Sequence, residues 1–214
     1  MTRKSPAFRA LASAAALAFT VIALAPAAAK KKTDALPAAV GSKAPDFTLP
    51  ASDGADRALA SYRDKIVVLE WLNYDCPFSR KHYTSGNMQA LQKEYASKGV
   101  VWLSIISSAP GKQGNYRPEE ISKISKERGA HPAAILLDPK GAVGRLYGAK
   151  TTPHMFVIDK GSLVYAGAID DKPTTDAEDV ATARNYVREA LDALLAGKPV
   201  PTPYTKSYGC SVKY

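Results

Sequence analysis

The chain has 214 residues, of which 46% are hydrophobic and 23% are charged, and its formal net charge is +9. This length suffices for one domain with a buried core and tails. Beyond the N-terminal 32 residues the basic residues are interspersed with acids and form no clustered basic and aromatic face, which argues against nucleic acid as a partner.

The first 29 residues have the three-part pattern of a secretory signal peptide. Arg3, Lys4 and Arg9 form a basic front, residues 11–24 are mostly apolar, and the alanines at 27–29 offer cleavage sites. We therefore expect a secreted or periplasmic protein. The alternative is an uncleaved membrane anchor, which the Ala-rich run disfavours because a spanning helix needs ~20 strongly apolar residues. No later stretch could cross a bilayer, so we expect no membrane span after cleavage.

Residues 30–39 resemble a linker, and a domain is expected over residues 40–198. Its first clear element is the apolar run "IVVLEWL" at 66–72. This run is rich in β-branched residues and does not alternate, which predicts a strand covered on both faces. A helix is expected after Pro77, with Gly86 as a site where it could split and Gly99 as its end.

The rest of the domain alternates between strands and helices. Strands are expected at 100–108, 133–138, 153–159 and 163–169, and helices at 118–129, 142–148 and 175–198. This order predicts an α/β fold whose central mixed sheet is flanked by helices, parallel where helices intervene and antiparallel for the last pair. The proline-rich tail at 199–214 carries the second of two cysteines.

Cys76 lies between the strand at 66–72 and the helix that begins at Pro77. Unpaired N–H groups and the positive end of the helix dipole favour a thiolate there, and the thiolate is the nucleophilic form. Ser79, one turn further on, could donate a hydrogen bond to the sulfur. The alternative for Cys76 is a buried structural cysteine.

The segments "GSKAPDFTL", "KIVVLEWLNYDCPF", "GVVWLSIISSAPG" and "TTPHMFVID" resemble the thioredoxin-fold redoxins that include the alkyl hydroperoxide reductase and thiol-specific antioxidant peroxiredoxins. The resemblance covers about residues 40–198, and the block from Asn73 resembles an exported, peroxiredoxin-like branch. It implies a thioredoxin-like fold. In that fold a cis-proline packs against the active-site cysteine, and the edge beside it binds substrate. Thr152 and Pro153 match these positions, and the alternative for Pro153 is an ordinary trans proline at the entrance of a strand.

The chain departs from both well-understood activities of these relatives. Thioredoxin-like proteins use Cys-x-x-Cys, whereas Ser79 stands at the second position of "CPFS", which excludes a local dithiol cycle. Peroxiredoxins have threonine or serine three residues before the reactive cysteine and a proline four residues before that. Asn73 and Leu69 occupy these positions here, and Asn73 can still donate hydrogen bonds to a peroxide. The arginine beside the family's thiolate is not assigned among Arg80, Arg117 and Arg145.

Cys210, in the segment "SYGCSVKY", is the only internal candidate for a resolving thiol. In two-cysteine peroxiredoxins a cysteine near the C-terminus condenses with the oxidised first cysteine. The tail looks mobile, so Cys210 could reach Cys76 within one chain or from a neighbour. Alternatively the two form a permanent disulfide, which would stabilise the fold by ~3–5 kcal/mol. The sequence leaves both readings open.

The leading hypothesis is a thiol-dependent oxidoreductase of the peroxiredoxin-like type. Cys76 is its nucleophile, Asn73 and Ser79 stabilise the thiolate, and Cys210 resolves the oxidised form. Thr152 and Pro153 shape the edge that binds the substrate. The expected partners are a peroxide or a protein thiol or disulfide and an external thiol reductant, and no cofactor is expected.

Two alternatives belong to other classes. One is a non-catalytic thioredoxin-fold binding protein with a structural Cys76–Cys210 disulfide. The weaker one is a copper-handling protein, in which Cys76 would act with one or two of His82, His131 and His154. Copper chaperones of this fold carry two cysteines in the loop, however, so no metal site is assigned.

Overall fold

A computed structural model describes residues 1–2 and 38–214. Nearly all of the predicted signal peptide and linker therefore lies outside the described residues. Within the described part, no helix is long and apolar enough to cross a membrane.

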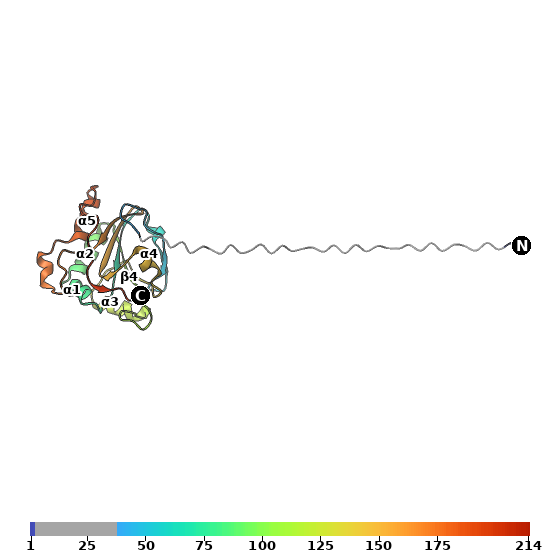
Figure 1. The fold of residues 1–214 in the computed structure, drawn as a ribbon, viewed down its shortest axis with the longest axis horizontal. Coiled ribbons are helices and arrows are strands. Elements are labelled where there is room, and N and C mark those ends of the chain that lie inside the picture. The colour runs from blue at the N-terminus through green and yellow to red at the C-terminus, as the bar shows by residue number, and fades with distance from the viewer. Residues whose placement is uncertain (3–37) are drawn as a thin grey trace. The chain divides into compact units, whose positions relative to one another are not determined.

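A five-stranded sheet in the order β5-β4-β3-β7-β8 forms the centre of the domain (Figure 1). Its strands are β3 (Ile66–Trp71), β4 (Val101–Ile106), β5 (Ala134–Leu137), β7 (His154–Asp159) and β8 (Ser162–Gly167). β3 runs parallel to β4 and antiparallel to β7, and β8 runs antiparallel to β7. The predicted mixed sheet is confirmed.

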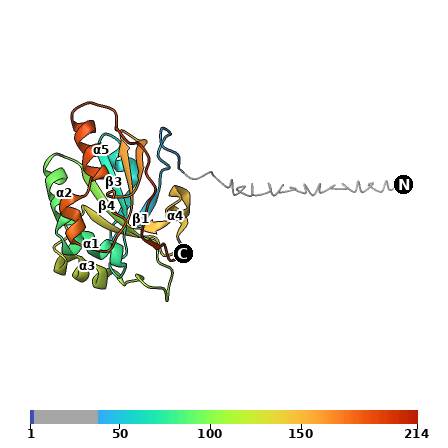
Figure 2. The same cartoon turned by 60° about the vertical axis from the view of Figure 1, so that its left-hand side comes forward.

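The central strand β3 is covered on both faces, as its apolar run predicts. Residues 67–71 are at most 1% exposed. One apolar core lies on the face covered by α1 (Pro77–Thr84), α2 (Asn87–Ser97), α3 (Pro118–Glu127) and α5 (Tyr186–Leu195). The other core lies on the face covered by α4 (Ala142–Tyr147) and β1 (Thr48–Pro50), which pairs with β2 (Asp56–Ala58) (Figure 2).

The helices after Pro77 divide where the sequence allows it. Gly86 adopts a left-handed conformation with φ of 77°, and this residue separates α1 from α2. A residue with a side chain is disfavoured in that conformation.

The helix predicted over 175–198 is wrong in its first half. Instead, the short 3-10 helix η2 (Glu178–Thr182) is followed by an extended segment that starts at Ala183, and α5 begins only at Tyr186. A second 3-10 helix, η1 (Leu59–Tyr62), lies before β3. The side chain of Asn185 accepts a hydrogen bond from the backbone N–H of Arg188 at 2.9 Å. Asparagine competes with helical backbone hydrogen bonds and favours such N-caps, so the helix starts after it.

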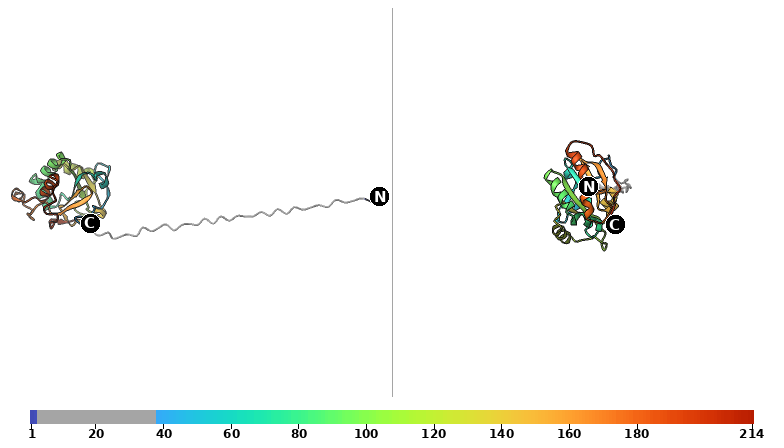
Figure 3. Two further views of the ribbon diagram at one scale, coloured as in Figure 1. Left: turned by 90° about the horizontal axis from the view of Figure 1, so that it is seen from above. Right: turned by 90° about the vertical axis from the view of Figure 1, so that its left-hand side faces the viewer.

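The tail that looked mobile packs against the domain, and this expectation is corrected. Its short strand β9 (Cys210–Ser211) pairs antiparallel with β6 (Thr151–Thr152). The last residue, Tyr214, donates a hydrogen bond to the carbonyl of Ala149 at 2.8 Å. The chain therefore ends against the domain (Figure 3). Backbone pairing with a distant strand explains the difference, because no local sequence pattern encodes it.

Candidate functional site

Cys76 lies where β3 gives way to α1, as the sequence predicts. It is the N-cap residue of α1, and Pro77 is the first residue of the helix. Its backbone N–H donates to the carbonyl of Asn73 at 3.1 Å, which closes the turn after β3. The Cys76 side chain is 0% exposed. The sulfur therefore sits at the positive end of a helix and out of water.

Asn73 and Ser79 lie near Cys76, but neither side chain makes the contact with the Cys76 sulfur that was predicted for it. The Asn73 side-chain oxygen accepts from the Asp75 backbone N–H at 2.9 Å, so it shapes the loop. It also packs so closely on Gly114 that an added Cβ there would lie 2.6 Å from it. The Ser79 hydroxyl is buried without a hydrogen-bond partner, and the backbone N–H of Ser79 lowers the pKa of the Cys76 thiol.

Thr152 and Pro153 border Cys76 on its other side. The Thr152–Pro153 peptide bond is cis, an isomer that the sequence left open. The Cys76 thiol donates to the Thr152 carbonyl, with 2.9 Å between sulfur and oxygen. This brings together the helix-start cysteine and the strand-entrance proline, which are far apart in sequence.

The tail carries Cys210 to the same place. In the β6–β9 ladder, Cys210 is the register partner of Thr152. The two cysteines are free thiols, Cys76 buried and Cys210 half-buried. The Cys210 thiol is near enough to the Cys76 sulfur that each changes the pKa of the other. A pair of adjacent thiols, one of them shielded, therefore forms the centre of the candidate site.

The two thiols have opposite acidities. Burial alone would raise the pKa of Cys76, but the neighbouring Cys210 thiol, Thr152 and the Ser79 backbone N–H lower that pKa overall. Burial, together with the hydrogen bond and charge of Cys76, raises the pKa of Cys210 to about 11. Cys76 is thus the more acidic thiol of the pair and Cys210 the one that stays protonated, which makes Cys76 the better candidate for the nucleophile.

Arg145, His82 and His154, three of the candidate residues, have other contacts. The guanidinium of Arg145 packs 4.4 Å from the centre of the Tyr214 ring. His154 accepts a hydrogen bond from the Lys150 backbone N–H at 3.2 Å, and His82 bonds to Asn87 at 3.0 Å. Across residues 1–2 and 38–214, no group of three or more His, Cys, Asp or Glu residues could hold a metal ion.

Sequence reasoning missed two buried polar clusters beside the site. Glu70, in the middle of β3, accepts hydrogen bonds from Tyr83, Gln92, Trp102 and Ser104, and burial raises its pKa. A lone acid in an apolar strand was the available signal. The second cluster contains Lys81, Asp170 and Tyr208. No spacing in the sequence joins these three positions.

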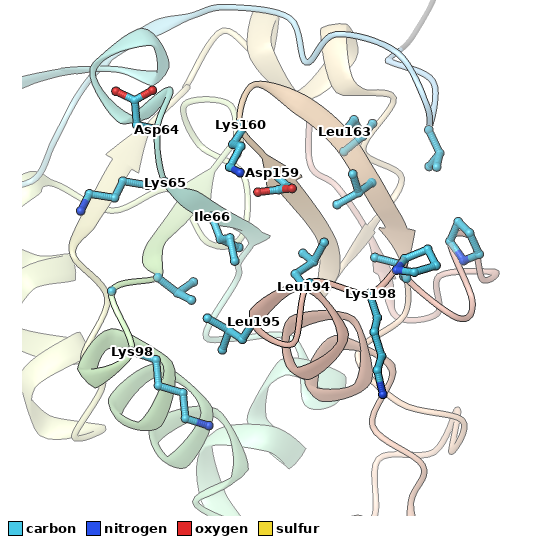
Figure 4. A pocket seen from close by; sticks show the side chains of 18 of the residues that line it. Asp64, Lys65, Ile66, Lys98, Asp159, Lys160, Leu163, Leu194, Leu195 and Lys198 are labelled. Atoms are coloured by element: carbon cyan, nitrogen blue, oxygen red, sulfur yellow. The ribbon is translucent and has the colours of Figure 1, made fainter.

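A groove of about 860 Å³ lies at the other end of the sheet (Figure 4). Ile66, at the start of β3, lies on its floor beside Leu194, and Lys65, Lys160 and Lys198 line it. Cys76 follows the opposite end of β3. This groove is therefore separate from the cysteine pair.

Comparisons with known proteins agree with this architecture. Residues 40–166 match the model of the AhpC/TSA family. The thiol-disulfide oxidoreductase ResA of Geobacillus thermodenitrificans (strain NG80-2) is 31% identical over 133 residues, which are 62% of this chain and 70% of that protein.

Two crystal structures resemble most of the chain. An uncharacterized conserved protein from Geobacillus kaustophilus superposes with a TM-score of 0.70 at 31% identity, covering 82% of this chain and 92% of that one. A hypothetical protein from Sinorhizobium meliloti 1021 gives 0.69 at 28% identity, covering 82% and 94%. With the family match and the sheet order, these likenesses confirm the thioredoxin-like fold.

Proposed function

The chain belongs to the AhpC/TSA family of thioredoxin-fold redoxins, and we propose that it is an exported thiol–disulfide oxidoreductase. Cys76 is its nucleophile and Cys210 its resolving thiol. The observation that carries the proposal is the neighbouring pair of free thiols, in which the pKa of Cys76 is lowered and that of Cys210 raised. Similarity to the oxidoreductase ResA supports the same reaction class.

The proposed reaction consumes one substrate disulfide in two exchange steps. The Cys76 thiolate attacks one substrate sulfur, a mixed disulfide forms, and the second substrate sulfur leaves as a thiolate. That leaving thiolate takes the proton of Cys210. The Cys210 thiolate then attacks the Cys76 sulfur, forms the Cys76–Cys210 bond and expels the first substrate sulfur. An external dithiol returns two electrons and two protons and restores both thiols.

Three further groups have roles in this proposal. The Ser79 backbone N–H and the helix N-terminus stabilise the Cys76 thiolate. The edge at Thr152, which now pairs with Cys210, would accept the substrate backbone when the tail withdraws. Asn73 has an indirect role, because its side chain fixes the turn that holds Cys76.

A peroxide is the second candidate oxidant, favoured by the complete burial of Cys76 and by the AhpC/TSA match. A small oxidant needs a narrower opening than a protein does. The Cys76 thiolate would attack one peroxide oxygen, the O–O bond would break with the second oxygen leaving as hydroxide, and Cys76 would become a sulfenic acid. Cys210 would then displace water and form the same Cys76–Cys210 disulfide.

Matched cysteine variants test the proposal. The consumption of glutathione disulfide and of hydrogen peroxide is measured separately with dithiothreitol as reductant. We expect Cys76→Ser to abolish the faster of the two activities. We expect Cys210→Ser to retain the first attack and to accumulate a mixed disulfide or a sulfenic acid on Cys76, seen by intact-mass spectrometry. If Cys76→Ser retained the wild-type rate with both oxidants, the non-catalytic binding protein would be the better assignment.

Export is tested separately. Expression of the full chain in a bacterium, followed by fractionation and N-terminal sequencing, should give a periplasmic or secreted product that begins near residue 30. A cytoplasmic product that begins at Met1 would contradict this part of the proposal.

A further inference from the structure

The tail is anchored two residues before Cys210 by a group of buried side chains that the proposed reaction does not use. Tyr208 donates a hydrogen bond from its hydroxyl to Asp170, and His82 lies 3.3 Å from the same hydroxyl. Asp170 is 2% exposed and His82 is 0% exposed. A tail residue thus reaches a polar site inside the domain.

The site beneath Tyr208 carries paired charges. The Lys81 ammonium lies 3.5 Å from the second Asp170 oxygen and donates to the Lys172 carbonyl at 2.6 Å. The Lys172 backbone N–H donates to Asp170 at 3.0 Å. Breaking up a buried ion pair leaves an uncompensated charge, which is costly. Asp170 is therefore a fixed acceptor for the Tyr208 hydroxyl.

The Tyr208 ring is fixed as well as its hydroxyl. Phe78, on α1, contacts it edge-on with 5.9 Å between ring centres. The Lys81 ammonium lies 5.7 Å from the ring centre. Aromatic and cation contacts of this kind add to the hydrogen bond and limit rotation of the ring. Phe78 and Lys81 both belong to α1, the helix that begins beside Cys76.

Only one residue separates Tyr208 from Cys210, so fixing the first constrains the second. Gly209 has φ of 137°, and a Cβ there would overlap the Thr152 carbonyl oxygen. Consecutive Cα atoms are ~3.8 Å apart, so Cys210 can lie no further than two such steps from the anchor. The Gly209 backbone lies directly against the Thr152 carbonyl, and the next residue, Cys210, lies beside Cys76.

We propose that Tyr208, held by Asp170, Lys81, His82 and Phe78, is a positioning residue that sets how readily Cys210 reaches Cys76. It touches no reacting atom and acts through the backbone of Gly209. The inference rests on the proposed function, because it assigns Tyr208 to the resolving step of that reaction. Such anchoring raises the effective concentration of one thiol beside another.

The test measures the effective concentration of Cys210 at Cys76 from the equilibrium between the Cys76–Cys210 disulfide and glutathione. Tyr208→Ala removes the ring, Tyr208→Phe removes only the hydroxyl, and Tyr204→Ala is the control because that tyrosine is 66% exposed in the same tail. We expect Tyr208→Ala to lower the effective concentration at least about tenfold, Tyr208→Phe to lower it less, and Tyr204→Ala to leave it within about twofold.

A second readout separates positioning from general destabilisation. The absorbance of the Cys76 thiolate near 240 nm is followed against pH in the same three variants. Loss of the Cys210 donor should move the Cys76 titration to higher pH in Tyr208→Ala and leave it unchanged in Tyr204→Ala. Far-UV circular dichroism checks that each variant is folded, and Tyr208→Phe keeps the test valid if Tyr208→Ala does not fold.

The outcomes distinguish this inference from the proposed function. A wild-type effective concentration in both Tyr208 variants would overturn the positioning role while leaving the thiol pair intact. If the wild-type chain never formed a Cys76–Cys210 bond under oxidising glutathione, the proposed function itself would fail.

Discussion

At the scale of single residues, the chemistry depends on what surrounds one sulfur atom. Burial of Cys76 opposes ionisation, while the donors around it favour ionisation. The Thr152 carbonyl, 2.9 Å from the sulfur, accepts from the thiol and so favours the protonated form. The groups that lower the pKa of Cys76 outweigh its burial, and Cys210 contributes the most among them. The reactivity of Cys76 is therefore coupled to the position of the tail.

This coupling predicts how two small substitutions change the acidity of Cys76. Cys210→Ala removes a donor thiol and should raise the pKa of Cys76. Ser79→Ala removes a hydroxyl without a partner but keeps the backbone N–H that lowers the pKa of Cys76, so the pKa of Cys76 should stay unchanged. The pH profile of the rate at which iodoacetamide alkylates Cys76 measures both. The reverse pattern would show that the Ser79 hydroxyl supplies the stabilisation.

Two buried histidines predict that the fold loses stability in acid. Burial lowers the pKa of His82 to about 4 and that of His154 to about 4. The unfolded chain binds these protons near pH 6.5, whereas the folded chain binds them only near pH 4. The free energy of unfolding is therefore highest above pH 6.5 and decreases as the pH falls towards 4. Each ring accounts for roughly 3 kcal/mol of this loss.

Histidine proton resonances recorded against pH measure this directly, with the urea-unfolded chain as the reference. We expect the two buried rings to remain neutral at pH 5 in the folded protein. Titration of both rings at the pH of the unfolded chain would contradict the prediction. Glu70 acts in the opposite direction, since burial raises its pKa, so the resonances are a cleaner readout than overall stability.

At the scale of elements, the strand β9 brings Cys210 into register with Thr152. Gly209 makes this approach possible, because a side chain there would overlap the Thr152 carbonyl oxygen. Gly111 has a similarly positive φ of 76° but faces open space, which makes it a matched control.

Gly209→Ala should therefore separate β9 from β6, whereas Gly111→Ala should cost only backbone strain, about 1 kcal/mol. The reaction of Cys76 with iodoacetamide, compared at equal fractions of thiolate, together with denaturant unfolding, measures both effects. We expect faster alkylation in Gly209→Ala alone. Equal alkylation rates in the two variants would show that the strand pairing does not depend on this close approach.

Local patterns determined which elements could be predicted. The apolar run at 66–72, Pro77 and Gly86 indicated β3, α1 and the break before α2, and all three are present. The start of α5 was missed because the cap at Asn185 competes with a pattern that looked helical further upstream. The strand β9 was missed because its partner β6 lies about 60 residues earlier, a non-local pairing that periodicity cannot indicate.

The candidate site was predictable only where local patterns or the family resemblance indicate its residues. Cys76 follows from its place between a strand and a helix, and Thr152 and Pro153 follow from the family resemblance. The contact between the two cysteines and the anchor at Tyr208 depend on where the tail docks. That docking arises from buried tertiary contacts with Asp170 and Lys81, which no sequence spacing indicates.

At the scale of the whole molecule, we expect the tail to determine how accessible Cys76 is. Cys76 is 0% exposed while the tail lies across the edge at Thr152. A substrate that uses this edge must compete with the tail. The domain thus carries its own strand in the place where the proposed substrate would bind.

Removal of residues 206–214 should therefore uncover Cys76. We expect iodoacetamide to alkylate Cys76 in the shortened chain faster than in full-length Cys210→Ala, compared at equal fractions of thiolate. Both chains lack Cys210, so their difference reports only the cover provided by the tail. Equal rates would show that loops of the domain, rather than the tail, shield the sulfur.

The central claim is that Cys76 and Cys210 form a reversible redox pair, and peptide mass spectrometry after differential alkylation tests it most directly. The mature protein is alkylated as purified, after mild reduction, and after oxidation by peroxide or glutathione disulfide. The account predicts two free thiols after reduction and a Cys76–Cys210 link after oxidation that mild reductant opens again. A link that resists mild reductant, or oxidation that never joins these two residues, would contradict it.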